Sequence, residues 1–370
     1  MSQQTEFIAP AKPVIGEEEI EAAVRVLRSG MVVQGPEVAA FEAEFGELIG
    51  GGRHCVAVNS GTSALLLALH ALEIGPGDEV IVPSFTFAAT ANAVSLVGAT
   101  PVFADVEPDT FNLDPDSVAA AIGPDTAAIM PVHLYGHPAA MTRINELAER
   151  HSLAVLEDAA QAHGATLGGV QVGALGDMAC FSFYPTKNMH SLEGGMVVTP
   201  DEQAARRIRL LRNQGMEKRY ANEIAGYNVR LTDVAAAIGR VQLRKLAGWN
   251  ESRQANAAKL NAGLSGGTFG LRTPHVADGA THVYHQYTVR VPGGNRDALQ
   301  AHLTENKVGS AVYYPTPVHR LAPFASTPDD GLDVTMRLAE EVLSLPVHPS
   351  LTDADLDRVI GAVQSFEPEN

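Results

Sequence analysis

The sequence predicts an α/β protein with a mostly parallel sheet, helices on both faces and a smaller C-terminal α/β unit. Two observations support this fold class. Short apolar runs of strand length alternate with helical patterns, which is typical of parallel sheets covered on both faces. After a long helical pattern that begins at residue 231, a second and shorter series of strands and helices follows. We therefore expect a large domain over residues 1–245 and a small domain over residues 246–370.

The individual elements are expected in the following order. An acidic stretch ("EEEIEAAVRVLRSG") predicts a helix that ends at Gly30, with its apolar stripe at Ile20, Ala23, Val24 and Leu27. The expected strands of the large domain are residues 55–58, 79–82, 101–106, 127–134, 153–158, 178–183 and 195–199, with helices between them at 64–72, 88–98 and 141–151. The small domain should contain strands at 283–291 and 309–314, a helix from residue 296 and a closing helix over 353–366.

The composition restricts the classes of partner. Acidic residues outnumber basic ones by 43 to 26, which gives a formal net charge of −17. Nucleic acid and anionic membranes should repel such a chain, so a bound phosphate must be held locally by backbone N–H groups and hydroxyls. The two cysteines, Cys55 and Cys180, lie in expected strands without metal-ligand spacing, so we expect no metal site and free thiols in a reducing cytoplasm.

No membrane segment or signal peptide is expected. Residues 80–104 contain no charged residue and are long enough to span a bilayer. Prolines, a glycine and several hydroxyl side chains interrupt this stretch, so it is better explained as strand, loop, helix and strand in a protein interior. The N-terminal residues lack the apolar region of a signal peptide.

Polar residues follow three of the expected strands. Residues 59–63 ("NSGTS") open a helix, Asp158 follows "LAVLE", and Lys187 follows "FSFYPT". Each is ordinary on its own, because Ser and Thr cap helices, Asp is common in turns and a single Lys is usually solvated. Because ligands bind beyond the carboxyl ends of parallel strands, we instead expect the three groups to meet there.

One cofactor requires this combination of groups. The sequence contains neither a Walker-type glycine-lysine loop nor G-x-G-x-x-G, which disfavours ATP and dinucleotides. Pyridoxal 5'-phosphate needs its phosphate held, its aldehyde bound by a lysine as a Schiff base and its pyridine nitrogen kept protonated by an acid. The sequence therefore predicts a pyridoxal-phosphate site.

The chain resembles the DegT/StrS-type sugar aminotransferases (the DegT/DnrJ family), a branch of the fold-type-I pyridoxal-phosphate enzymes. The resemblance rests on stretches that keep the order of the family from near residue 10 to near residue 350: "AKPVIGEEE", "NSGTSAL", "PSFTFAATANAV", "EDAAQAHGA", "FSFYPTKN…EGGMVVT", "GYNVRLTDVAAAIGRVQL" and "YYPTPVH". It implies a fold-type-I aminotransferase with a homodimer that shares its active sites.

The resemblance also implies roles for residues around the cofactor. Lys187 matches the Schiff-base lysine and Asp158 the partner of the pyridine nitrogen. Gln161 matches the residue near the ring and its hydroxyl, and Phe87 the aromatic residue stacked on the other ring face. The phosphate ligands implied by the resemblance are Gly61, Thr62 and Ser182, with Ser60 and Ser63 beside them.

Further residues of the matching stretches are candidates for contacts with the substrate or with a second subunit. Asn228 lies in the motif that reaches the phosphate of a neighbouring subunit. His163, His319 and Tyr314 are candidate substrate contacts, although each is also explained as a packed or satisfied side chain. Arg230 is a candidate contact for an acidic group, and a salt bridge at the start of a helix explains it equally well.

The reaction implied by the resemblance transfers an amino group in two halves. An amino acid, expected to be L-glutamate, leaves its amine on the cofactor as pyridoxamine 5'-phosphate, and the amine then passes to a ketone of a nucleotide-linked sugar. Lys187 carries the proton in both halves. In the family, E-G-G after the lysine, as at Glu193-Gly194-Gly195, more often accompanies amination at carbon 4 or of a cyclitol, and "SFYPTKN" favours a nucleotide sugar. The resemblance therefore favours a nucleotide-4-keto-6-deoxyhexose that becomes the 4-amino sugar.

Three alternatives stay open at this point. A 3-ketosugar or a ketocyclitol would suit the same scaffold. A non-catalytic sensor of small molecules could also use this fold. Dehydrating members of the family replace the lysine by histidine, and two cysteines cannot hold a four-thiolate iron–sulfur cluster, so both of those variants are disfavoured.

Overall fold

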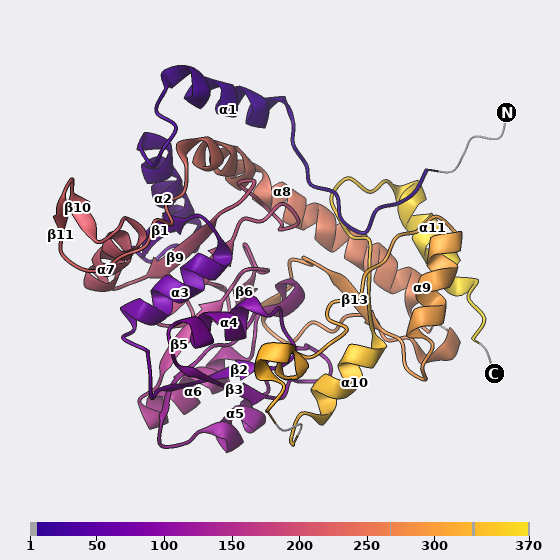
Figure 1. The fold of residues 1–370 in the computed structure, drawn as a ribbon. Helices are drawn as coiled ribbons and strands as arrows, with labels where there is room; N and C mark the ends of the chain where they lie inside the picture. The colour runs from indigo at the N-terminus through magenta and orange to yellow at the C-terminus, as the bar shows by residue number, and fades with distance from the viewer. Residues whose placement is uncertain (1–5, 267, 328–329, 369–370) are drawn as a thin grey trace.

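A sheet of seven strands forms the centre of the large domain (Figure 1). The computed structural model describes residues 6–266, 268–327 and 330–368. Strand pairs β2–β3, β2–β4, β4–β5 and β5–β8 are parallel, whereas β9 pairs antiparallel with both β8 and β1. Across the sheet the order is β1 (His54–Val58), β9 (Gly195–Thr199), β8 (Met178–Ser182), β5 (Ala154–Asp158), β4 (Thr126–Ile129), β2 (Glu79–Pro83) and β3 (Thr100–Ala104).

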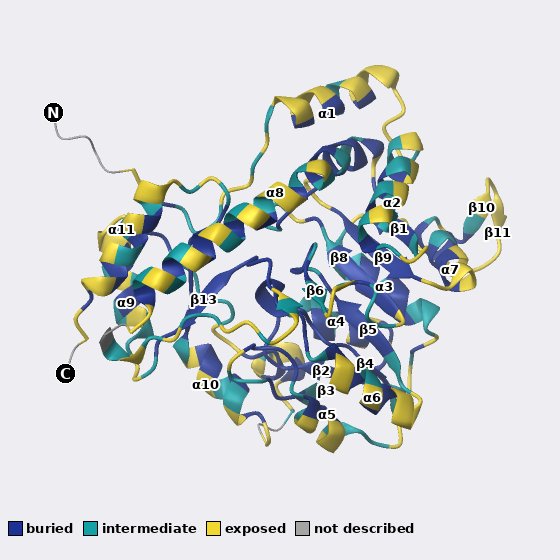
Figure 2. Cartoon of the chain, turned by 180° about the vertical axis from the view of Figure 1, so that it is seen from behind, coloured by how far each residue is buried: buried dark blue, intermediate teal, exposed yellow. Residues whose placement is uncertain are grey.

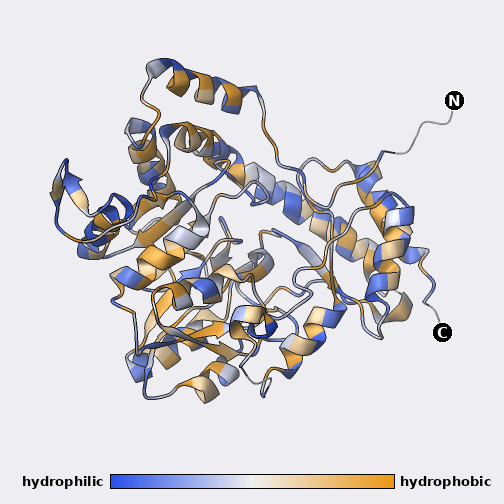
Figure 3. Ribbon diagram, viewed as in Figure 1, coloured by the Kyte–Doolittle hydropathy of each residue, from blue (hydrophilic) through white to orange (hydrophobic). Residues whose placement is uncertain are grey.

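Helices cover both faces of this sheet. One face packs against α3 (Gly61–Ala71), α4 (Ala89–Leu96) and α7 (Glu202–Arg212). The other face packs against α2 (Pro36–Ile49) and the start of α8 (Asp233–Leu264), and further along against α5 (Pro115–Ala121) and α6 (Met141–His151). The strands and α3 carry mostly hydrophobic residues (Figure 3), so apolar burial is the main stabilising contribution to this layered core.

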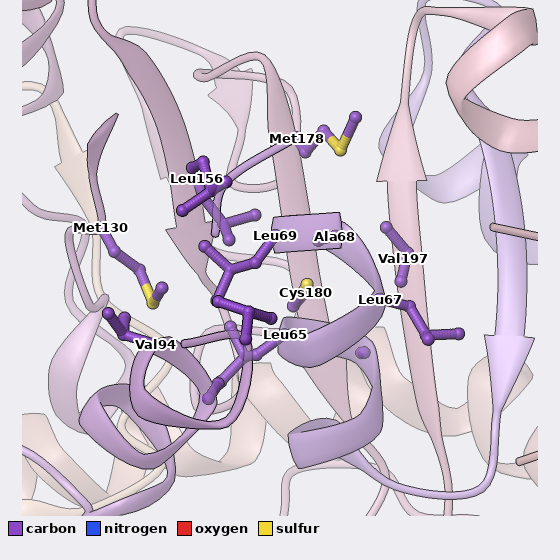
Figure 4. Packing of buried hydrophobic residues seen from close by; sticks show 14 of the residues in the cluster. Leu65, Leu67, Ala68, Leu69, Val94, Met130, Leu156, Met178, Cys180 and Val197 are labelled. Carbon is purple, nitrogen blue, oxygen red and sulfur yellow. The ribbon is translucent and has the colours of Figure 1, made fainter. Parts of the chain in front are cut away.

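Alternate residues of each strand point to opposite faces, as β geometry requires. Leu156 of β5 and Cys180 of β8 contact the leucines of α3 (Figure 4). Val155 and Phe181, their neighbours in the chain, belong to clusters on the other face. The side chain that follows Leu156 by two positions, Asp158, is therefore directed to the α3 face.

The small domain has a separate core. It is built on the pair β13 (Tyr287–Arg290) and β14 (Val342–Leu345), covered by α9 (Arg296–Glu305) and α11 (Asp353–Gln364). Helix α10 (Asp333–Glu341) leads into β14. The long helix α8 connects the two cores, with exposed and buried residues alternating along it (Figure 2). Helix α8 is continuous through residue 245. The predicted boundary between the two domains at that residue stays a prediction.

Three smaller features project from this framework. Helix α1 (Glu17–Ser29) lies on α8, and the hairpin β10 (Met216–Lys218) and β11 (Ala221–Asn222) extends beyond α7 (Figure 1). A short sheet joins β6 (Thr166–Leu167), β7 (Val170–Gln171) and β12 (Ala280–Thr281). Among the described residues, no helix has the length and apolar character needed to cross a membrane.

Two sequence predictions about elements are wrong. The α1 stripe is on the other face of the helix, because Ala22 and Val26 pack inward while Ile20 and Leu27 are exposed. Residues 309–314 form only an isolated bridge, between Ala311 and Ser344 of β14, which also pairs with β13. Helix periodicity alone does not decide which of two similar stripes meets a neighbouring element, and an apolar run of strand length can lie beside a sheet without pairing along its length.

Candidate active site

A pocket of about 460 Å³ lies at the carboxyl ends of β5 and β8. It is lined by the start of α3, by loops that follow the central strands and by small-domain residues. Most of the residues predicted to surround a cofactor line it: Gly61, Thr62, Phe87, Asp158, Gln161, Ser182, Lys187 and Tyr314, together with Ser60.

Asp158 ends β5, level with Cys180 of the parallel strand β8. The carboxylate is 5% exposed and accepts hydrogen bonds from Thr90 Oγ1 at 2.9 Å and from the backbone N–H of Ala160 at 3.2 Å. Burial raises the pKa of Asp158, and these two bonds and the charge of Lys187 counteract part of that rise. A cation placed against this carboxylate would favour its ionised form.

Lys187 lies in the loop that follows β8, where its backbone N–H donates to the carbonyl of Tyr184 at 2.9 Å. Burial lowers the pKa of Lys187 from its usual 10.5 to about 8, and the charge of Asp158 opposes that change. Desolvation of the ammonium group is the larger effect. A substantial fraction of this amine is therefore neutral, and nucleophilic, near physiological pH.

The first turn of α3 approaches β8 closely. Ser60 caps the helix by accepting a hydrogen bond from the N–H of Ser63 at 3.1 Å. A side chain at Gly61 would place its Cβ 2.7 Å from Cβ of Ser182, so only glycine fits there without movement. Free backbone N–H groups and hydroxyls consequently converge at a helix N-terminus, an arrangement that binds anions.

A hydrogen-bonded chain crosses the pocket wall. Gln161 Nε2 donates to the hydroxyl of Tyr314 at 3.0 Å, and Gln161 Oε1 accepts from the N–H of Tyr135 at 2.8 Å. Burial raises the pKa of Tyr314, which keeps its hydroxyl protonated. The ring of Phe87, 59% exposed, has its centroid 6.0 Å from that of Tyr314. The pocket lining thus contains an exposed aromatic ring and an amide that two hydrogen bonds hold in place.

Three residues predicted for ligand contacts are not part of the pocket lining. Ser63 donates its hydroxyl to Asn59 Oδ1 at 2.7 Å. His163 is fully buried between Phe181 and Phe183, and burial lowers its pKa to about 3. His319 is also fully buried and its Nδ1 is 2.5 Å from Ser84 Oγ. These contacts favour structural roles, and the predicted ligand contacts stay predictions.

Asn228 and Arg230 lie outside the pocket of their own chain. Asn228 is exposed and forms an isolated bridge with Asn213. Arg230 donates through Nη1 to Asn213 Oδ1 at 2.8 Å. Contact of Asn228 with a neighbouring subunit, and of Arg230 with an acidic group, stay predictions.

Sequence reasoning missed several residues that complete the pocket. They come from separate elements and carry no local motif that signals a ligand, so only the fold brings them together. Tyr184 is the exception, because it lies three residues before Lys187 in the chain. The missed lining residues include Thr86, Tyr135, Tyr184, His285, Gln286 and Tyr313.

Comparison with known proteins identifies relatives along nearly the whole chain. The profile of the DegT/DnrJ/EryC1/StrS aminotransferase family matches residues 13–364. A dTDP-3-amino-3,4,6-trideoxy-alpha-D-glucose transaminase of Streptomyces venezuelae is 46% identical over 94% of this chain and 92% of its own length. A UDP-N-acetyl-3-dehydro-alpha-D-glucosamine 3-aminotransferase of Acidithiobacillus ferrooxidans is 44% identical over 92% and 91%.

The fold has close counterparts among solved structures. One is DesV of S. venezuelae in complex with a ketimine intermediate, with a TM-score of 0.91 and 46% identity over 94% of this chain and 93% of that chain. This agreement confirms the predicted fold class, a fold-type-I aminotransferase with a mostly parallel sheet.

The lowered pKa of Lys187 predicts unusual reactivity of its amine. In the cofactor-free protein, brief acetylation across a pH series, with peptide mass spectrometry, should give half-maximal labelling of Lys187 near the pKa of about 8. The exposed Lys218, labelled in the same samples, is the internal control for the activity of the reagent and the recovery of peptides. The Asp158→Asn variant should titrate lower still, because Asp158 raises the pKa of the amine. Half-maximal labelling of Lys187 only near the ordinary value for a lysine amine, about 10.4, would contradict the lowered pKa.

Proposed function

The chain belongs to the DegT/DnrJ/EryC1/StrS aminotransferase family, and from this premise we propose that it is a pyridoxal-phosphate-dependent transaminase of a nucleotide-linked keto sugar. The amino donor is an amino acid, L-glutamate in the first instance. The single observation that carries the proposal is the pocket in which a buried carboxylate, Asp158, and a lysine of lowered pKa, Lys187, lie beside the N-terminus of α3. A non-catalytic sensor would not need that lysine.

The residues of the pocket fit pyridoxal phosphate. Gly61 leaves room for a phosphate to approach the backbone N–H groups of α3, and the hydroxyls of Thr62 and Ser182 are in the same part of the lining. Asp158 would hold the proton on the pyridine nitrogen, and that cation would offset the desolvation of the carboxylate. Phe87 would cover one face of the ring.

Lys187 supplies the acid–base chemistry. When bound, the cofactor supplies an aldehyde for the incoming amine and a ring that withdraws electrons from the adjacent carbon. Released from the aldehyde, Nζ of Lys187 is neutral at pH values around its pKa of about 8 and accepts the proton from Cα of the donor. In the second half-reaction the same atom returns a proton to the sugar carbon that receives nitrogen. Tyr314 and Gln161 hold the opposite wall of the pocket in place.

The carbon that receives nitrogen is the least constrained part of the proposal. Glu193 lines the pocket, and the sequence prediction based on its loop favours carbon 4 of a 4-keto-6-deoxyhexose. The two relatives described above are named for amino groups at carbon 3. We therefore propose the 3-keto sugar as the second candidate substrate, to be compared directly with the 4-keto isomer.

A substrate panel tests this function. The purified protein should be yellow, and L-glutamate should bleach it as the amine is taken up. Separate addition of the 3-keto and 4-keto isomers of a dTDP-6-deoxyhexose, with a ketocyclitol as a further arm, should give one aminated product, and NMR locates its new C–N bond. Lys187→Ala is the control and should aminate nothing. A protein that stays unbleached and aminates none of the panel would overturn the proposal.

The active unit is proposed to be a homodimer in the cytoplasm. Asn228 is exposed and does not line the pocket of its own chain, as expected for a side chain that completes the phosphate site of a second subunit. Exposed apolar side chains on α1, on the segment after it and on the β10–β11 arm would be covered by that subunit: Ile20, Leu27, Met31, Val33, Tyr220, Ile224 and Tyr227.

Mixing inactive variants tests the shared site. Lys187→Ala and Asn228→Ala proteins, each inactive as homodimers, should regain up to about a quarter of wild-type activity after mixing and subunit exchange, because one site of each heterodimer is intact. A mixture of Lys187→Ala with Asp158→Ala is the matched control and should regain nothing, since both residues line one pocket of one chain. Absence of activity in the first mixture, despite demonstrated exchange, would exclude the shared site.

A further inference from the structure

A second, smaller cavity lies beside the pocket and shares Lys187 with it. Its volume is about 20 Å³, and it is enclosed by residues 10–14, residues 185–188, α8 and two small-domain histidines. Thr186, Lys187 and His285 line both this cavity and the larger pocket. A group bound there would therefore reach the catalytic lysine.

The lining of the small cavity is basic. Lys12, Lys187 and Arg253 line it together with three histidines, and none of the described residues that line it is an aspartate or glutamate. This is unusual in a chain with 43 acidic and 26 basic residues. The larger pocket has a different charge, because its lining, among the described residues, contains the carboxylates of Asp158 and Glu193 and no arginine.

Arg253 is the central residue of this cavity. It lies on α8, is 6% exposed and donates through Nη1 to the carbonyls of Tyr284 at 3.0 Å and His285 at 3.4 Å. Its Nε is buried without a hydrogen-bond partner, and among the described residues no carboxylate forms an ion pair with it. Burying a guanidinium without an anionic partner costs free energy. The presence of such an arginine in the fold therefore indicates that a ligand brings the anionic partner.

His285 provides a second unsatisfied group at the junction of the two cavities. Its side chain is 5% exposed, and its Nδ1 is buried without a hydrogen-bond partner in the described part of the chain. Burial keeps the pKa of His285 well below its usual range, with Lys187 and Arg253 adding to the effect. An anion between these residues would give both Arg253 and His285 the partner that they lack.

We propose that this cavity binds the carboxylate of the amino donor, with Arg253 as its principal ligand and His285 and Lys12 beside it. The inference rests on the proposed transamination. In an amino acid the carboxylate carbon lies only about 2.5 Å from the amine nitrogen, so a donor reacting at Lys187 must place its carboxylate next to that lysine. The volume admits a group the size of one or two water molecules, which suits a carboxylate end and excludes a sugar.

Glutarate binding tests the site without any reaction, because glutarate has the carboxylates of glutamate and no amine. Calorimetric titration of the cofactor-loaded protein should give an affinity that Arg253→Gln lowers by about 10- to 100-fold, as for a lost hydrogen bond between charged groups. Arg253→Lys should lower it by a smaller factor. Lys12→Gln, at an exposed position on the rim, should lower it about two- to fivefold.

Two control variants show whether Arg253, rather than another arginine, binds the carboxylate. Arg244→Gln removes a charge from an exposed position of the same helix and should leave glutarate binding unchanged. Arg230→Gln tests whether the arginine near the shared site is the ligand instead. In the half-reactions, Arg253→Gln should raise the KM for L-glutamate, whereas reaction of the pyridoxamine form with the keto sugar should keep its wild-type rate.

Different outcomes test the donor-carboxylate site and the proposed transaminase function separately. Wild-type glutarate affinity in folded Arg253→Gln, or loss of binding in Arg230→Gln alone, would overturn the carboxylate site and leave the transaminase proposal intact. Glutarate binding that depends on Arg253 in a protein that aminates no keto sugar would support the site and overturn the substrate proposal. If Arg253→Gln fails to fold, the Arg253→Lys and Lys12→Gln proteins decide, and wild-type affinity in both would overturn the inference.

Discussion

The parallel pairing of β5 with β8 is the constraint on which the site depends. Its register places Asp158 level with Cys180 and brings the Lys187 loop to the same edge of the sheet. Buried Glu157 fixes the end of β5, because it accepts hydrogen bonds from three backbone N–H groups of residues 173–176 and from His133. A slip of one residue would turn Asp158 to the opposite face, away from α3 and the lysine.

Burial adjusts the two reactive groups in complementary directions. It raises the pKa of Asp158 and lowers that of Lys187. Each group is therefore neutral over a wider range of pH than it would be in water. A cofactor with a cationic ring and an aldehyde changes both conditions together, because it gives the carboxylate a charged partner and gives the amine a covalent one. The unpaired Arg253 follows the same logic, since its missing partner is supplied by the substrate.

The sequence predicted most of the large domain and the meeting of Gly61, Asp158 and Lys187 at one edge of the sheet, because these features depend on local signals. Apolar strand runs, the small residues around Gly61 and the Lys187 loop are each visible along the chain. Tyr135 and His285 were not predictable, since they reach the pocket only through tertiary packing. The same limitation explains His163, which adjoins the cofactor motif in the sequence but packs between two phenylalanines in the structure.

In the proposed reaction Asp158 keeps the bound cofactor electron-withdrawing while Lys187 moves the proton. The most direct measurement is the single-turnover rate at which L-glutamate bleaches the Asp158→Asn protein, with the bound cofactor quantified by absorbance. We expect a rate lower by about 100-fold or more, equivalent to about 2.7 kcal/mol of barrier, with most of the cofactor retained. A loss smaller than about tenfold would contradict it, because another group would then hold the proton on the ring.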